Sequence, residues 1–161
     1  MVVTRITYER TRARRQVVNI FILEDDPQRM KLFHEVLGFN VVHRDNFEDA
    51  KEAFSKYKPF DLALLDHDLC DDHYIGKRLE ENTGWNFAKW AAETQGCDDA
   101  IYTIIHSYNP DGAARMETLL QKAGWNAHRL PFGLKLLSWL KLFIKEDGSH
   151  AEPPAYPLNP K

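Results

Sequence analysis

Two acids flank a histidine directly after an apolar segment of the chain, in the sequence Asp66-His67-Asp68. The preceding segment 62–65 consists of leucine and alanine, which is typical of a strand that is buried on both faces. Unpaired carboxylates are expensive to bury, whereas carboxylate oxygens bind divalent cations and imidazole exchanges protons near neutral pH. The motif therefore indicates either metal and phosphate chemistry or a polar loop whose acids cap the next helix.

Reactive side chains follow two other predicted strands as well. The residues after the strands predicted at 17–23 and 100–105 are Glu24, Asp25, Asp26, His106 and Ser107. In a parallel sheet of order 2-1-3-4-5, the first, third and fourth strands are adjacent, and ligands bind outside their carboxyl ends. The agreement of three strand ends favours a functional site over a loop of capping acids.

The carboxylates at the ends of the first and third strands, which include Glu24, Asp25, Asp66 and Asp68, would face a common point and could hold one or two divalent metal ions. Clustered carboxylates select hard cations, so Mg²⁺ or Mn²⁺ is the expected metal, and the nearby histidines keep Zn²⁺ as an alternative. Without a cation these acids would repel one another and raise their own pKa values. The sequence thus predicts a metal-dependent site.

The rest of the pattern supplies the elements that would position this site. Segments typical of strands lie at 17–23, 39–43, 61–65, 100–105 and 125–130. Helices are predicted at 27–37, 47–57, 84–95, 110–123 and 136–144. In the fourth, Ala114, Leu119 and Ala123 are spaced for burial, and Leu120 widens that face. This alternation predicts an α/β fold: a single doubly wound, five-stranded parallel sheet of order 2-1-3-4-5 with helices on both faces.

Length and charge divide the chain into a domain and two flanking segments. One domain is expected at 17–145, because 161 residues suffice for a single core. Segment 1–16 carries five arginines against Glu9, so its charge is +4 while the rest of the chain carries −7. It is either a basic arm that touches nucleic acid or a nucleotide phosphate, or an extra strand. Segment 146–161 holds four of the eight prolines and is expected to be an extended tail.

The apolar and cysteine content indicates the compartment. No apolar run approaches the roughly 20 residues that span a bilayer, and the N-terminus is polar and arginine-rich, unlike a signal peptide. We therefore expect a cytoplasmic protein without membrane contact. Cys70 and Cys97 form neither a disulfide framework nor a CxxC metal pair, although Cys70, beside the central motif, is an alternative metal ligand.

Four short motifs resemble the receiver domains of response regulators. They are the segment 21–27 with its acidic pair, the strand end Leu64-Leu65-Asp66, Ser107 after the fourth strand, and Pro131-Phe132. The resemblance covers residues 17–144 and implies a receiver, flavodoxin-like fold. It also implies that Glu24 and Asp25 hold Mg²⁺. Asp66 would then accept phosphate, and Ser107 would contact the phosphoryl group.

Other residues depart from the receiver pattern. Leu130 stands where receivers carry the lysine that pairs with the phosphoryl group, and histidines follow both Asp66 and the fourth strand. These features resemble a divergent receiver-like group that is named for cyclic-phosphate processing. The resemblance rests on Leu65-Asp66-His67-Asp68-Leu69, Thr83-Gly84, His106-Ser107 and Arg29. It favours an enzyme over a phosphorelay receiver.

The function that this resemblance implies is a metal-dependent phosphoesterase acting on a cyclic phosphate or a cyclic nucleotide or oligonucleotide. Its expected catalytic residues are His67, His106, Asp68 and Ser107, and its expected substrate-binding residues are Arg29 and Thr83. Two alternatives stay open: a signalling receiver that accepts phosphate on Asp66, and a module that sequesters a nucleotide without turnover. Trp85 and Tyr108 would either stack on a base or serve as ordinary core or rim aromatics.

Overall fold

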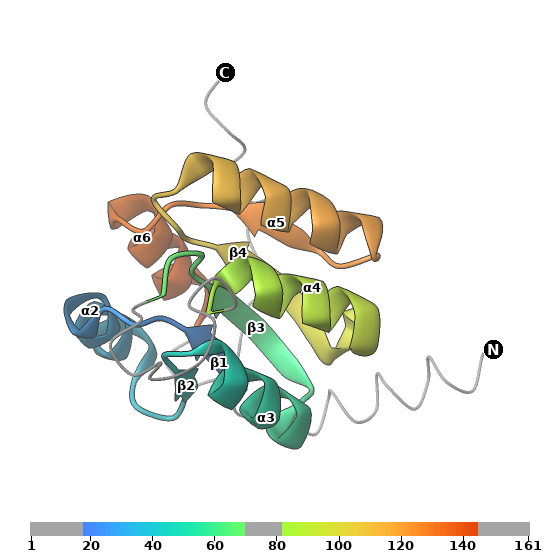
Figure 1. Ribbon diagram of the computed structural model, residues 1–161. Helices are drawn as coiled ribbons and strands as arrows, with labels where there is room; N and C mark the ends of the chain where they lie inside the picture. Colours follow the sequence, from blue (N-terminus) through green and yellow to red (C-terminus); the bar gives the residue numbers. More distant parts are fainter. Residues whose placement is uncertain (1–17, 70–81, 145–161) are drawn as a thin grey trace.

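The computed structural model describes residues 18–69 and 82–144, and a five-stranded parallel sheet lies at its centre (Figure 1). The strands are β1 (Ile20–Leu23), β2 (Val42–Arg44), β3 (Phe60–Leu65), β4 (Ala100–Ile105) and β5 (Ala127–Arg129). Their order is β2-β1-β3-β4-β5. The predicted α/β class and strand order are confirmed, although β1, β2 and β5 are shorter than the sequence indicated.

Among the described residues, helices alternate with these strands. The α-helices are α2 (Pro27–Leu37), α3 (Phe47–Tyr57), α4 (Gly84–Thr94), α5 (Pro110–Lys122) and α6 (Leu134–Phe143), and a short 3₁₀ helix, η2 (Cys97–Asp99), precedes β4. Four of them begin after a side chain that accepts hydrogen bonds from backbone N–H groups of the first turn. These N-caps are Asp26, Asn46, Thr83 and Asn109. The caps fix where α2, α4 and α5 begin, and these helices begin close to the strand ends.

The helices cover both faces of the sheet (Figure 1). α3, α4 and α5 pack on one face, whose core contains Phe21, Phe54, Leu65, Phe87 and Met116. α2 and α6 pack on the other face, whose core contains Ile22, Phe33, Leu64, Trp139 and Leu140. Successive residues of a strand therefore face opposite helix layers.

The inner face of α5 differs from the prediction. The residues expected to face inward were Ala114, Leu119 and Ala123, on a face widened by Leu120. The residues that the helix buries are Gly112, Ala113, Met116 and Leu120, and Ala123 is exposed. Met116 and Leu120 lie four residues apart on one helix face and bury far more apolar area than the alanines could. The prediction holds for Leu120 and was wrong for Ala123, because alanine spacing alone does not show which face carries the large side chains.

The sheet register brings three reactive residues to the same level. Leu23 pairs with Leu65, and Leu65 pairs with Ile105. The ladder continues one residue further, because the N–H of Asp66 donates to the Leu23 carbonyl and the N–H of His106 donates to the Leu65 carbonyl, each at 3.0 Å. Glu24, Asp66 and His106 are thus neighbours across the carboxyl edge of the sheet.

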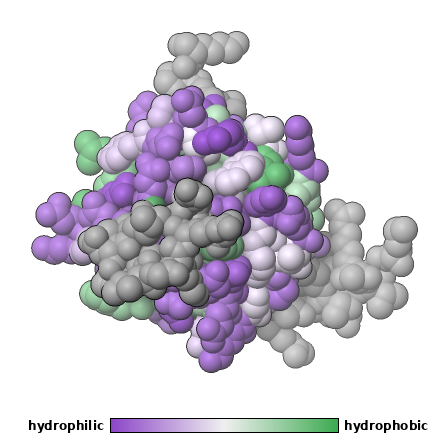
Figure 2. All heavy atoms as spheres, viewed as in Figure 1, coloured by the Kyte–Doolittle hydropathy of each residue, from purple (hydrophilic) through white to green (hydrophobic). Residues whose placement is uncertain are grey.

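On the face of the molecule seen in Figure 2, hydrophilic residues cover most of the described surface. No helix in the described part of the chain combines the length and apolar composition that crossing a membrane requires. The predicted arm 1–16, the predicted tail 146–161 and Cys70 lie outside the described residues. The domain bounds 17–145 therefore stay a prediction.

Candidate functional site

Glu24 directly follows β1, is fully buried, and contacts Arg29 and His106 through its carboxylate. Its Oε2 accepts a hydrogen bond from His106 Nε2 at 2.8 Å, and its Oε1 accepts one from the Asp26 N–H at 2.9 Å. Arg29 Nη2 lies 3.0 Å from the same Oε1. The backbone carbonyl of Glu24 accepts a hydrogen bond from His43 Nε2 at 2.7 Å. These contacts hold the carboxylate in one orientation.

Asp66 meets the same network from the end of β3. Its Oδ2 lies 3.0 Å from Arg29 Nη2, and its Oδ1 accepts a hydrogen bond from the His67 N–H at 2.8 Å. A single guanidinium nitrogen therefore bridges the carboxylates of Glu24 and Asp66. Arg29 reaches this point from the first turn of α2, where Asp26 caps the helix.

Glu24, Asp66 and His106 could together hold a metal ion. Each offers a ligand atom, and these atoms lie within 4.8 Å of one another. His106 is fully buried, and its Nδ1 has no hydrogen-bond partner among the described residues. Two carboxylates and an imidazole suit Mn²⁺ or Zn²⁺ better than Mg²⁺, which prefers oxygen ligands. The set contains His106, expected to be catalytic, in place of the expected ligand Asp25, which is half-buried.

The two buried carboxylates have opposite pKa shifts. Burial alone would raise the pKa of Glu24, but the hydrogen bond and charge of His106, the Asp26 N–H and Arg29 together lower it below the ordinary value. Burial raises the pKa of Asp66, and the charge of Glu24 adds to this effect, whereas His106 and Arg29 oppose it. The site therefore favours the ionised form of Glu24 and disfavours that of Asp66.

This contrast predicts opposite effects of two isosteric substitutions on stability. A depressed pKa means that Glu24 contributes stability that is present at neutral pH and is lost as the pH falls through its folded-state pKa. A raised pKa means that Asp66 contributes stability that is lost as the pH rises through its folded-state pKa. At pH 7 we expect Glu24→Gln to lower the free energy of unfolding by about 1–3 kcal/mol. Asp66→Asn is expected to raise it by about 0.5–2 kcal/mol.

Urea denaturation from pH 4 to pH 8 measures both effects, and both should shrink at the acid end. Glu48→Gln is the matched control, because Glu48 is a partly exposed surface residue that pairs with Lys51 at 3.1 Å. A surface pair of this kind is worth less than about 1 kcal/mol. Equal destabilisation by Glu24→Gln and Asp66→Asn at pH 7 would contradict the opposite shifts.

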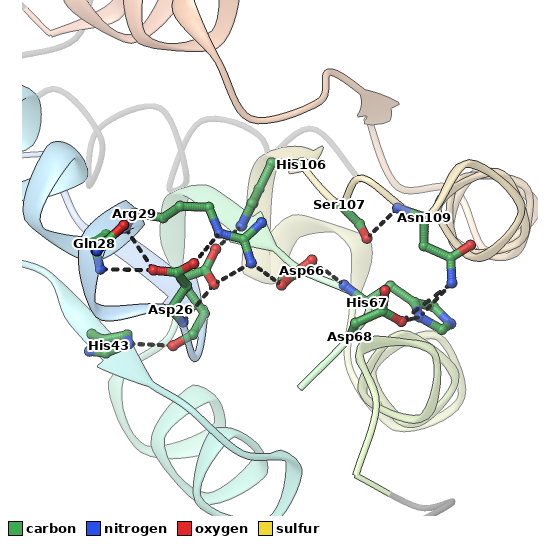
Figure 3. A network of polar contacts seen from close by, with 11 residues as sticks. Asp26, Gln28, Arg29, His43, Asp66, His67, Asp68, His106, Ser107 and Asn109 are labelled. Carbon is green, nitrogen blue, oxygen red and sulfur yellow. Dashed lines mark hydrogen bonds and ion pairs between the residues drawn. The ribbon is translucent and has the colours of Figure 1, made fainter. Parts of the chain in front are cut away.

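A second polar group contains His67, Asp68 and Asn109 (Figure 3). His67 Nδ1 lies 2.6 Å from Asp68 Oδ1, and Asn109 Nδ2 donates to the same oxygen at 3.3 Å. Burial acts to raise the pKa of Asp68, but the hydrogen bonds from His67 and Asn109 outweigh it and lower that pKa. An ionised carboxylate only accepts, so Nδ1 of His67 carries the hydrogen and Nε2 is the basic nitrogen.

Strand alternation separates the two groups. Asp66 and His106 point toward the α2 face, where the His106 ring lies 5.3 Å from the ring of Phe33. His67 is the next residue after Asp66 and points to the opposite face, against Gly112 at the start of α5. Figure 3 accordingly shows Arg29 and His106 on one side of Asp66, and His67 on the other. The predicted catalytic residues therefore form two clusters that share Asp66.

Two glycines leave room for His67. The N–H of Gly84 donates to the His67 carbonyl at 2.8 Å, and a Cβ at Gly84 would overlap the Asp66 carbonyl oxygen. A Cβ at Gly112 would lie 2.5 Å from Cδ2 of the His67 ring. The first turns of α4 and α5 therefore lie directly against the Asp66–His67 backbone and the imidazole, respectively.

The other predicted site residues have local partners. The Thr83 hydroxyl caps α4 by accepting a hydrogen bond from the Asn86 N–H at 3.2 Å. The buried Ser107 hydroxyl accepts one from the Asn109 N–H at 3.1 Å. Tyr108 is 66% exposed, so it lies at the rim, whereas Trp85 packs partly buried against the core. The substrate-binding role of Thr83 and the catalytic role of Ser107 stay predictions.

The sequence did not single out two residues that support the site. Asn109 was expected only to begin a helix, yet its side chain also contacts Asp68. His43 was treated as an ordinary strand residue, yet it bonds the Glu24 carbonyl from the neighbouring strand β2. The position of Asn109 two residues after Ser107 offered a signal, because both follow the same strand. His43 offered none, since its contact depends on the register of β1 and β2.

Comparisons with solved structures find receiver domains. The BeF₃-activated DrrB receiver domain is 18% identical, with a TM-score of 0.52 over 78% of this chain and 95% of that chain. The Mn²⁺-bound form of the response regulator Rcp1 is 18% identical, with a TM-score of 0.51 over 77% and 89%. The response regulator DrrB, an OmpR/PhoB homologue from Thermotoga maritima, is 19% identical, with a TM-score of 0.50 over 79% and 52%. Identities this low show a shared fold alone.

Among curated proteins, no match is found. The model of one family, described as the cyclic-phosphate processing receiver domain, matches residues 18–122. This range is well over half of the chain and holds both clusters of the site, including the strand ends after β1, β3 and β4. Together with the receiver fold, the match confirms the resemblance that the strand-end motifs indicated. The chain belongs to the cyclic-phosphate processing receiver family.

Proposed function

We propose that the protein is a metal-dependent phosphoesterase that opens a cyclic phosphate ester, such as that of a cyclic nucleotide or oligonucleotide. The observation that carries the proposal is that two imidazoles at the strand ends are each held by a carboxylate. His106 is held by Glu24 at 2.8 Å, and His67 is held by Asp68 at 2.6 Å. A carboxylate partner orients an imidazole and stabilises its protonated form, as general acid–base catalysis requires.

The two imidazoles suit an in-line displacement at phosphorus. In such a reaction the attacking water and the leaving ester oxygen lie on opposite sides of the phosphorus. His67 and His106 likewise lie on opposite sides of Asp66 (Figure 3). His67 Nε2 would accept a proton from water as the new P–O bond forms. His106 would donate a proton from Nδ1 to the ester oxygen as its bond to phosphorus breaks, so that one water is consumed and a linear phosphomonoester forms.

The remaining residues would bind the metal ion and the phosphoryl group. Glu24 and Asp66 would hold a divalent cation through their carboxylates, whereas His106, the third member of the candidate ligand set, would stay unbound in this mechanism because both of its ring nitrogens donate. When bound there, such a cation would polarise a phosphoryl oxygen and lower the pKa of a water molecule. Arg29 would pair with phosphoryl oxygens, because guanidinium recognises them through parallel hydrogen bonds. The Mn²⁺-bound form of Rcp1, which shares the fold, is a precedent for manganese binding by a protein of this fold.

The main alternative is a signalling receiver that accepts phosphate on Asp66. Its support is the position of Asp66 at the end of the central strand, next to Glu24, in a fold shared with an activated receiver domain. Three observations favour the esterase instead. Asp66 is only 1% exposed, both of its oxygens already have donors, and Leu130 stands where receivers carry lysine.

An assay with purified protein tests the proposal. The substrates are 2′,3′-cyclic, 3′,5′-cyclic and oligonucleotide cyclic phosphates, each with Mg²⁺, Mn²⁺ or EDTA, in water enriched in ¹⁸O. We expect a linear phosphomonoester that carries one ¹⁸O atom, formed with a metal and not with EDTA. Stable labelling of Asp66 by a small phosphodonor, with no hydrolysis of any substrate, would instead establish the receiver function. Tight binding of a substrate without turnover would identify a sequestering module.

A further inference from the structure

We propose that Arg29 competes with the divalent cation for Glu24 and Asp66, and that a phosphoryl anion relieves this competition, so that anion and metal bind cooperatively. The inference rests on the metal and phosphate site of the proposed function. Arg29 Nη2 lies 3.0 Å from Glu24 Oε1 and 3.0 Å from Asp66 Oδ2. A cation that used these two oxygens would lie within contact distance of the guanidinium, and the two positive charges would repel each other.

Arg29 is more exposed to solvent than the two carboxylates that it bridges. The side chain of Arg29 is 17% exposed, whereas those of Glu24 and Asp66 are 0% and 2% exposed. Of these three groups, the guanidinium is therefore the one most accessible to a ligand from solvent. The acids also raise the pKa of Arg29 against the effect of its burial, so it stays charged. The guanidinium that neutralises the two carboxylates is thus also more exposed than they are.

The surroundings of Arg29 provide other partners for its side chain. Its Nε has no hydrogen-bond partner among the described residues, and the nearest acid to it is Asp26, with Oδ2 at 3.6 Å. The guanidinium carbon lies 5.6 Å from the centre of the Tyr108 ring and 5.9 Å from that of Phe132. Both distances suit a cation–π contact. An acid and two aromatic rings therefore already lie beside the guanidinium, in addition to the two carboxylates that it bridges.

The coupling follows from the charges. Phosphoryl oxygens attract the guanidinium through charge-assisted hydrogen bonds. Moving Arg29 onto them leaves Glu24 and Asp66 buried without their cation, which is unfavourable. A divalent metal that binds the two carboxylates removes that penalty. A metal that binds in the absence of the anion has to displace Arg29, which then has no phosphoryl partner. Each ligand therefore binds more tightly when the other is present, by the same factor in both directions.

Mn²⁺ titrations with and without inorganic phosphate test the coupling in the wild-type protein. Free Mn²⁺ is quantified by its EPR signal, ionic strength is kept constant with chloride, and a titration without protein corrects for manganese phosphate pairing. We expect phosphate to lower the Kd for Mn²⁺ by at least about 10-fold, within the usual range of such couplings. The phosphate Kd should fall by an equal factor when Mn²⁺ is present. A manganese affinity that does not respond to phosphate would overturn the inference.

Substitution of Arg29 gives an independent readout. In Arg29→Gln the Kd for Mn²⁺ without phosphate should fall by about 10-fold, and the dependence on phosphate should disappear. Arg115→Gln is the matched control, since Arg115 lies on α5 with its guanidinium over Trp85 at 5.8 Å and should leave both quantities unchanged. If Mn²⁺ binds but phosphate does not change its affinity, the competition by Arg29 is contradicted and the metal site of the proposed function is not. Absence of Mn²⁺ binding in both proteins would contradict the metal site and with it the proposed function.

Discussion

Replacing His67 with glycine is expected to lower the rate of cyclic phosphate opening by about 10²–10⁴-fold, the usual contribution of a general acid–base group. The physical reason is the fixed tautomer of this imidazole. Asp68 accepts from Nδ1 at 2.6 Å, which makes Nε2 the basic nitrogen. The other members of the His67 cluster are poorer bases, because the lowered pKa of Asp68 weakens its carboxylate as a base and the amide of Asn109 is not basic.

Rescue by free imidazole separates a catalytic role from a structural one. His67→Gly leaves a space beside Gly112, whose backbone packs against the ring in the native protein. Imidazole added to this variant should restore part of the activity. It should not do so in Asp68→Asn, where the ring is present but its partner is changed. His34→Ala is the control, since His34 lies near the other end of α2, where it bonds the Gly38 carbonyl. Wild-type activity in His67→Gly would contradict the proposed mechanism.

The parts of this site that could be predicted from the sequence are those that depend on local pattern. The apolar segment before Asp66 ends abruptly, and Asp26 and Asn109 each precede a proline, so strand ends and helix starts follow from short-range rules. The clustering of Glu24, Asp66 and His106 followed from the strand order, which the structure confirms.

The parts that could not be predicted depend on side-chain direction and on contacts between distant segments. His67 was expected to join the same cluster as His106, but successive residues beyond a strand point to opposite faces, and the imidazoles diverge. Arg29 was expected to meet substrate, and the structure adds that it bridges two carboxylates from different strands. His43 reaches Glu24 only because the register of β1 and β2 brings them together. Such contacts require the assembled sheet.

At Gly84, too, the sequence predicts the element and the structure explains the residue. The sequence marked Thr83-Gly84 as the start of a helix, and the structure gives the reason for glycine. Thr83 caps α4, and Gly84 then lies so close to β3 that a Cβ would overlap the Asp66 carbonyl oxygen. The neighbouring atoms belong to the backbone at the end of a buried strand, so they cannot rotate away as a side chain would.

We therefore expect Gly84→Ala to lower the free energy of unfolding by about 3 kcal/mol or more, at the upper end of the range for overpacking. Urea denaturation measures this loss. Gly96→Ala is the matched control, because its Cβ would meet only the Asp99 carboxylate at 3.7 Å, and the backbone φ of −84° suits alanine. That variant should be neutral or gain up to about 1 kcal/mol.

Gly112→Ala completes the comparison, because the three atoms nearest to its Cβ would all belong to the ring of His67. A ring can rotate away at modest cost, so this variant should lose less stability than Gly84→Ala, by about 1–3 kcal/mol. Its hydrolase activity should nevertheless fall as far as that of His67→Gly, since the imidazole leaves Asp68. Equal free energies of unfolding for Gly84→Ala and Gly96→Ala would show that α4 does not pack closely against the end of β3. Full activity in Gly112→Ala would show that the position of His67 against α5 is not the catalytic one.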